Sequence, residues 1–301
     1  MTTVKTEASW QLTGPLQLDE TLRVTVPRSP ALLRSGRGKA DYSLWTAGGP
    51  ATVSLAVSSG SLRATAAGPG AELALAAAPR TVGLDDRPEL FRPAPGLMRD
   101  VHLRNLGLRL GASGRVFDTI LRMIIGQRVT TDEARRSYVR LVDKTGEPAP
   151  GELGLLLPPR PEAILALDQA AFHTLGIENA RARVIREAAR RATRLEEIIT
   201  MERGAAEDRL GALPGVGAWT VAQVMGSAWG DRDAVVYGDF HLPNTVTWAL
   251  AREPRGTDDR MGELLEPFRP QRRRAQLLIK MSGIHAPRYG PRSAKSTISR
   301  L

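Results

Sequence analysis

A carboxylate and a glycine-rich turn, about twenty residues apart, are the features of this sequence with the clearest chemistry. Asp239 follows the stretch Val235-Val236-Tyr237-Gly238 and precedes an expected helix that has Pro243 in its first turn. A carboxylate fixed in this way can stabilise a developing positive charge or deprotonate a water molecule. An N-cap is the commoner role of an aspartate before a helix, and a helix N-terminus would also help to keep Asp239 ionised.

The glycine-rich turn is Leu213-Pro214-Gly215-Val216-Gly217, between expected helices over 205–212 and 218–230. Two glycines let the backbone turn tightly and approach a ligand closely. The first amides of the second helix lack partners within it and point outward, so the turn could bind an anion such as a phosphate. The alternative is a plain connection between two helices with glycine after the first one.

The helix after the turn has two different faces. Its expected core stripe consists of Val221, Val224, Met225 and Ala228. At about 100° per residue, Trp219 and Gln223 share the opposite side. A tryptophan in that place either packs on another domain or offers a stacking surface for a base, and its position alone does not decide between the two.

The composition limits the classes of function. A hydrophobic content of 42% indicates a globular chain, and a net charge of +10 indicates a polyanionic partner, with nucleic acid first and an anionic membrane second. The absence of cysteine excludes disulfides, thiol nucleophiles and cysteine-held zinc or iron–sulfur clusters, and the four scattered histidines argue against a zinc site. We find no run of 18 apolar residues and no apolar signal core, and therefore expect a cytoplasmic protein.

The elements that must position these residues change in character along the chain. Short apolar segments separated by Gly and Ser predict antiparallel strands at Leu22–Val26, Thr52–Val57, Leu62–Ala66 and Glu72–Ala76. From about residue 113 the spacing is helical, with a loop expected over 141–161, a helix over 180–197 and a final helix or pair of helices over 261–284, broken near Pro270. We predict an α+β fold with a small antiparallel β-rich domain over 1–95, an all-α region over 96–285 and a basic tail over 286–301.

The phrase LPGVGAWTVAQV, at 213–224, resembles the signature of the helix-hairpin-helix (HhH-GPD) DNA glycosylase superfamily. The segment Ile124-Ile125-Gly126-Gln127-Arg128 resembles a second part of that family, and Asp239 follows the hairpin at the family's distance. Within the superfamily, the chain is most similar to the branch of 3-methyladenine DNA glycosylase II, which has Gly-Arg-Trp-Thr where this chain has Gly217-Ala218-Trp219-Thr220. The resemblance covers 113–285, and the β-rich N-terminal region also fits this branch.

This resemblance implies a monofunctional DNA glycosylase of base excision repair. Such an enzyme flips an alkylated, 3-methyladenine-like purine out of duplex DNA into a cleft between two helical lobes and hydrolyses its N-glycosidic bond, which leaves an abasic site. Asp239 would be the catalytic residue. An AP-lyase step is not expected, because bifunctional members carry a lysine at the position of Trp219. The alternative is a non-catalytic DNA-damage sensor or DNA-binding protein on the same fold.

The resemblance also implies the other site residues. The base pocket would be lined by Trp219, Gln223, Phe240 and Met281. This pocket is less aromatic than the family's pocket, so the sequence does not tell which damaged bases it accepts. DNA would be contacted by Gly215, Val216, Gly217, Thr220, Gln127 and Arg128. Arg128 would fill the gap left by the extruded base.

The implied partners are few. The expected partner is double-stranded DNA with a damaged base, and binding to a membrane is not expected. At the hairpin, the carbonyls of Gly211, Leu213 and Val216 would hold a structural Na⁺ or K⁺. No cofactor is required, an iron–sulfur cluster is not expected, and we expect a monomer. Two arginine clusters, at 181–191 and 272–274, are interpreted as solvated faces rather than DNA contacts.

Overall fold

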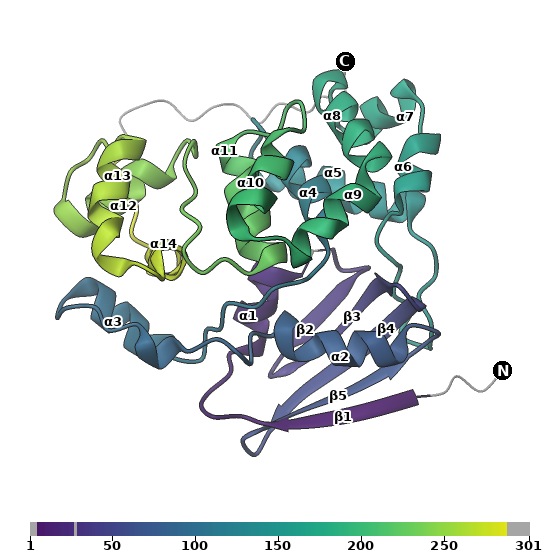
Figure 1. Cartoon of the computed structure of the whole chain (residues 1–301), viewed down its shortest axis with the longest axis horizontal. Helices are drawn as coiled ribbons and strands as arrows, with labels where there is room; N and C mark the ends of the chain where they lie inside the picture. The colour runs from purple at the N-terminus through teal and green to yellow at the C-terminus, as the bar shows by residue number, and fades with distance from the viewer. Residues whose placement is uncertain (1–4, 27–28, 288–301) are drawn as a thin grey trace.

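The structure is a computed structural model, and it describes residues 5–26 and 29–287. Its N-terminal part is a five-stranded antiparallel sheet, and helices make up most of the rest (Figure 1). The strands run in the order β1-β5-β4-β3-β2. Their bounds are Lys5–Gln11 (β1), Leu33–Gly36 (β2), Lys39–Thr46 (β3), Gly49–Ser58 (β4) and Ser61–Ala67 (β5). The predicted α+β fold is confirmed, and the expected strands at Thr52–Val57 and Leu62–Ala66 lie in β4 and β5. Most of the expected basic tail, from residue 288, lies outside the described residues.

Two of the expected strands are wrong, because those segments are helical. The segment Leu22–Val26 lies mostly within helix α1, Leu18–Thr25, whose buried side chains at Leu18 and Leu22 are one helical turn apart. The segment Glu72–Ala76 lies in helix α2, Ala71–Thr81, which packs on β4 and β5. Five alanines in the eleven residues of α2 favour a helix, and burial of Ala74 and Ala78 against the sheet places this helix on it.

The helical part after the sheet begins with α3, Leu97–Arg104. The later helices are α4 Val116–Ile125, α5 Thr131–Thr145, α6 Pro161–Ala166, α7 Gln169–Thr174, α8 Asn179–Arg190, α9 Ala192–Glu196, α10 Arg203–Gly211, α11 Ala218–Val224, α12 Leu242–Ala251, α13 Asp258–Leu265 and α14 Arg272–Met281. A π-helical turn, Met225–Trp229, extends α11. The loop expected from residue 141 starts only after α5, and the helix expected over 180–197 is divided into α8 and α9 at Arg191. A break near Pro270 between α13 and α14 is confirmed.

Buried side chains form three clusters, and α11 lies between two of them. The first cluster joins the sheet to α1 and α2. The second is built mainly from α4, α5, α8, α11 with Val224, and the π-helical turn with Met225. The third is built from α3, α12, α13 and α14, and Trp219 and Ala222 of α11 pack against it. The helix that follows the glycine-rich turn therefore connects two helical groups, and Figure 1 shows α11 in green between α4 and α5 on one side and the yellow α12, α13 and α14 on the other.

No helix among the described residues has the length and apolar character needed to cross a membrane.

Candidate active site

The glycine-rich turn is a tight connection between α10 and α11. Leu213 and Val216 are buried and anchor it, and the amide of Val216 donates to the carbonyl of Leu213 over 3.0 Å. Gly215 has a φ of +87°, and a Cβ at this position would lie 2.4 Å from Cγ2 of Val184 in α8. The turn thus requires glycine at 215 for both its backbone conformation and its close contact with α8.

The outer surface of the turn has free backbone donors. No side chain caps α11, and within residues 5–26 and 29–287 the amides of Gly215 and Gly217 have no hydrogen-bond partner. Gly217 and Ala218 line an open pocket of about 430 Å³ together with Gly211 and Val216. Unpaired amides at the start of a helix are suited to bind an anion.

Gln127 supports this turn from the end of α4. Its Nε2 donates to the carbonyl of Gly215 and to Oγ1 of Thr220, each over 3.0 Å. Thr220 is only 1% exposed, so its side chain lies beneath the turn. The side chain of Thr220 thus forms part of the internal support of the turn, and its expected contact with DNA stays a prediction.

Arg128 follows Gln127 with its side chain exposed and a φ of +58°. This left-handed conformation is uncommon for a residue other than glycine, and it changes the direction of the backbone after α4. The exposed side chain of Arg128 thus directly follows the residue that supports the turn, and its role in filling the gap left by an extruded base stays a prediction.

Asp239 is held between the turn and the start of α12. Its Oδ2 accepts a hydrogen bond from Nε1 of Trp219 over 3.1 Å, and its Oδ1 accepts from the amides of His241 and Leu242 over 3.0 and 2.9 Å. The preceding Gly238 has a φ of +75° and donates its amide to Oδ2 of Asp258 over 2.8 Å. The carboxylate is half-buried, so it remains in contact with solvent while three donors fix it. The role of helix cap and a chemical role are compatible here.

The charges around Asp239 favour its ionised form. Burial alone would raise the pKa of Asp239, but the ammonium of Lys280 and the hydrogen bonds from His241, Trp219 and Leu242 outweigh burial and lower the pKa below its ordinary value. At neutral pH this site therefore contains a fixed negative charge.

Lys280, at the end of α14, is the residue that the sequence analysis missed. Burial lowers its pKa, Asp239 raises it, Arg273 lowers it, and the net shift is downward. Its side chain is nevertheless exposed, and it lies near enough to Asp239 for their charges to interact. No ion pair within 4.0 Å joins these two described residues. Only five lysines occur in the chain, and this rarity was the one signal that could have drawn attention to Lys280.

The expected pocket residues are only partly brought together. Trp219 is bonded to Asp239 and half-buried, and Gln223, one turn later on α11, is also half-buried. Phe240 is 87% exposed, with its ring edge against His241, and its expected place in the base pocket stays a prediction. Met281 is 37% exposed at the end of α14, directly after Lys280.

The expected cation ligands are backbone carbonyls of the turn. Within the described residues, the carbonyls of Gly211 and Val216 accept no hydrogen bond, whereas that of Leu213 accepts one from the amide of Val216. Free carbonyl oxygens are suitable ligands for a hard monovalent cation. The same part of the chain contains no group of three or more His, Cys, Asp or Glu residues that could hold a metal ion.

Comparisons with known proteins identify the family of this chain. The family model of the HhH-GPD superfamily base excision DNA repair protein matches residues 121–271, which is half of the chain and includes Gln127, the turn and Asp239. A sequence comparison with curated proteins finds no match.

Solved structures share the fold over almost the whole chain. A 3-methyladenine DNA-glycosylase from Archaeoglobus fulgidus is 20% identical, with a TM-score of 0.78 over 92% of this chain and 98% of that one. MBOgg1 in complex with a low affinity DNA ligand is 15% identical, with a TM-score of 0.71 over 94% and 100%. An 8-oxoguanine glycosylase/lyase from Clostridium acetobutylicum is 12% identical, with a TM-score of 0.70 over 92% and 97%. At such identities the likeness shows the fold and does not select a substrate. From its family match, the chain belongs to the HhH-GPD superfamily of base excision DNA repair proteins.

Proposed function

We propose that this protein is a monofunctional DNA glycosylase that removes alkylated, 3-methyladenine-like purines from duplex DNA. The observation that carries the proposal is the environment of Asp239. Its carboxylate is ionised, fixed by three hydrogen bonds, open to solvent and directly bonded to the first turn of the helix that follows the glycine-rich turn.

A fixed negative charge suits this reaction because cleavage of the N-glycosidic bond places positive charge on the deoxyribose. A carboxylate near C1′ stabilises the oxocarbenium-like transition state more than the neutral ground state. A water molecule then adds at C1′ and loses a proton, the base leaves from the same carbon, and an abasic site remains. Asp239 would orient this water or accept its proton. The proposed hydrolysis needs no cofactor.

The glycine-rich turn would hold the DNA during this step. The free amides of Gly215 and Gly217 would bind a backbone phosphate, which positions the duplex without reading its sequence. A Na⁺ or K⁺ on the carbonyls of Gly211, Leu213 and Val216 would stiffen the turn and add positive charge beside that phosphate. Arg128 would occupy the space left by the flipped base.

Trp219 supports both parts of the proposal. Its indole is half-buried and orients Asp239, while its ring is available beside the carboxylate as a stacking surface for an electron-poor alkylated base. Trp219 also occupies the position at which bifunctional relatives carry a lysine, which favours base release without strand cleavage. The relatives in the comparison include both a 3-methyladenine DNA-glycosylase and an 8-oxoguanine glycosylase/lyase, so the choice between these chemistries rests on Trp219.

The test is a base-release assay on duplexes that contain one alkylated purine, with an 8-oxoguanine duplex as the comparison. The proposal expects release of the alkylated base, strand breakage only after treatment with heat or alkali, and no covalent adduct on addition of borohydride. Strand breakage without alkali, or a borohydride-trapped adduct that disappears in the Lys280→Met variant, would contradict monofunctional hydrolysis. Binding of the lesion duplex with no base release would instead identify a damage sensor.

A further inference from the structure

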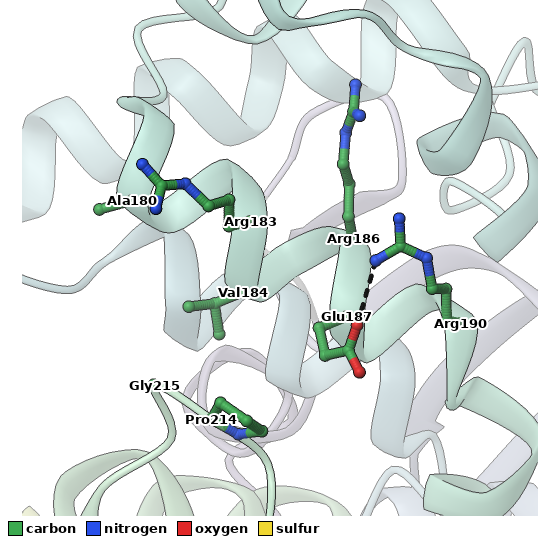
Figure 2. Close-up of a pocket in the computed structure, with 8 residues that line it drawn as sticks. All are labelled: Ala180, Arg183, Val184, Arg186, Glu187, Arg190, Pro214 and Gly215. Carbon is green, nitrogen blue, oxygen red and sulfur yellow. Dashed lines mark hydrogen bonds and ion pairs between the residues drawn. The ribbon is translucent and has the colours of Figure 1, made fainter.

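A second groove lies beside the glycine-rich turn, between that turn and α8. It has a volume of about 580 Å³. Its apolar surface comes from Ala180 and Val184 of α8 and from Pro214 and Gly215 of the turn. Figure 2 shows that arginines of α8 extend from the helix around this surface.

The arginines of this groove differ in how firmly they are held. Arg186 donates to the carbonyl of Leu167 and lies over the ring of Phe172, and in Figure 2 it points away from Pro214 and Gly215. Arg183 is exposed, and within the described part of the chain it has no hydrogen bond or ion pair. Arg190 is exposed and paired only with Glu187, over 3.1 Å. Two arginines are thus available to an incoming ligand.

Among the described residues that line the groove, Glu187 is the one acidic side chain, and its charge is already compensated. It forms ion pairs with Arg190 and with Arg191 of the same helix surface. If Arg190 exchanges its partner for an external anion, Arg191 remains to neutralise Glu187. The groove therefore keeps a net positive charge that favours an anionic ligand.

The shape and chemistry of the groove match a sugar–phosphate chain. An apolar floor accommodates the deoxyribose, and guanidinium groups at its rim pair with phosphates. Arg183 and Arg190 are seven residues apart on α8, which is about 10 Å along the helix axis. Phosphates along one strand of B-DNA are spaced by about 3.4 Å along its axis, so the two arginines span roughly three nucleotides.

Gly215 connects this groove to the site described above. Its close contact with Val184 places the surface of α8 directly against the turn whose amides are free to bind a phosphate. Pro214 and Gly215 also line the groove, so the groove and the free amides lie on the same turn.

We propose that this groove is a second DNA-backbone site, in which Arg183 and Arg190 bind phosphates of the strand that continues past the glycine-rich turn. The ligand is a phosphodiester chain, recognised without regard to base sequence. This inference rests on the proposed function only in assuming that the protein binds duplex DNA.

The experiment uses the double variant Arg183→Gln with Arg190→Gln in the full-length protein. Its affinity for an undamaged fluorescent duplex is measured by anisotropy at several salt concentrations, and base release is measured in single turnovers with saturating protein. We expect affinity to fall about tenfold or more, and the slope of log K against log salt to decrease in size by up to about 1.8, since each phosphate contact contributes about 0.9. The single-turnover rate should stay within about twofold of the wild-type rate, since neither arginine touches Asp239.

A matched control removes the same amount of charge from exposed arginines of the N-terminal sheet, Arg37→Gln with Arg63→Gln. This control should bind DNA like the wild-type protein. An unchanged affinity and salt slope in the α8 variant, or an equal loss in both variants, would overturn the proposal. Failure of the proposed function would look different, because the wild-type protein would then release no base. The DNA affinities of the α8 variant, the control variant and the wild-type protein would still decide the role of the groove.

Discussion

Nε1 of Trp219 donates a hydrogen bond to Oδ2 of Asp239 over 3.1 Å, and this contact joins the first turn of α11 to the residue just before α12. The residue that offers a stacking surface therefore also orients the carboxylate. A base stacked on the indole would lie beside the charge that acts on its sugar.

The Trp219→Phe variant should separate these two roles. Phenylalanine keeps an aromatic face but removes the donor, and a hydrogen bond to a charged group contributes about 1.5–3 kcal/mol. We expect single-turnover base release to slow by about ten- to hundredfold, while affinity for the lesion duplex changes little. A variant that keeps the wild-type rate would show that the hydrogen bond does not serve catalysis.

The Lys280→Met variant should change the pH dependence of base release. Lys280 lowers the pKa of Asp239, so its removal raises that pKa towards or above the ordinary value. The active form is the ionised carboxylate, and it is lost as the pH falls through the pKa of Asp239. The acidic limb of kcat/KM should therefore move to higher pH, and Lys280→Arg should restore it. The exposed Lys144→Met variant, on α5, is the control and should leave the profile unchanged.

Two glycine substitutions should distinguish folding of the turn from its contact with DNA. Gly215→Ala is strained by a φ of +87° and a Cβ 2.4 Å from Val184, so we expect it to lower the free energy of unfolding by about 1–3 kcal/mol or more. Gly217→Ala meets nothing within 4 Å and has an extended backbone, so it should unfold like the wild-type protein.

The Gly217→Ala variant should nevertheless bind duplex DNA less tightly, because its methyl group would stand beside the free amide at 217. Urea denaturation measures the free energy of unfolding of each variant, and fluorescence anisotropy independently measures its affinity for duplex DNA. Equal stability of both variants would contradict the requirement for glycine at 215.

Gln127→Ala should loosen the turn through its loss of two hydrogen bonds. The carbonyl of Gly215 and the buried hydroxyl of Thr220 would both lose their donor, and we expect a cost of about 1–3 kcal/mol in unfolding free energy together with weaker DNA binding. Thr220→Val removes only one of these contacts and should cost less. If Gln127→Ala is no less stable than Thr220→Val, Gln127 does not support the turn.

Local motifs were sufficient to predict the turn and its neighbours. The spacing in Leu213–Gly217 predicted a tight connection between two helices, and Pro243 placed Asp239 just before the next one. These features depend on residues close in sequence. The helical state of 22–26 and 72–76 was missed because apolar residues in short segments suit either a strand or a helix, and packing against the sheet decides between them.

The remaining parts of the site depend on contacts between distant segments. The buried Thr220 accepts a hydrogen bond from Gln127, 93 residues earlier, and no local pattern reveals that contact. Phe240 is exposed although it follows a half-buried aspartate, because Asp239 turns into the start of α12 and leaves the next side chain outside. Lys280 interacts with Asp239 only because α14 packs within the same cluster as α12.

The most direct test of the central claim is the single-turnover rate of base excision by Asp239→Asn on a duplex with one alkylated purine. Asparagine keeps the shape of the side chain and removes its charge. We expect excision to fall by about a hundredfold or more, as for loss of one electrostatic stabiliser, while the affinity for the same duplex stays within about threefold of the wild-type value. Excision at the wild-type rate by Asp239→Asn would show that the charge of Asp239 does not promote base release.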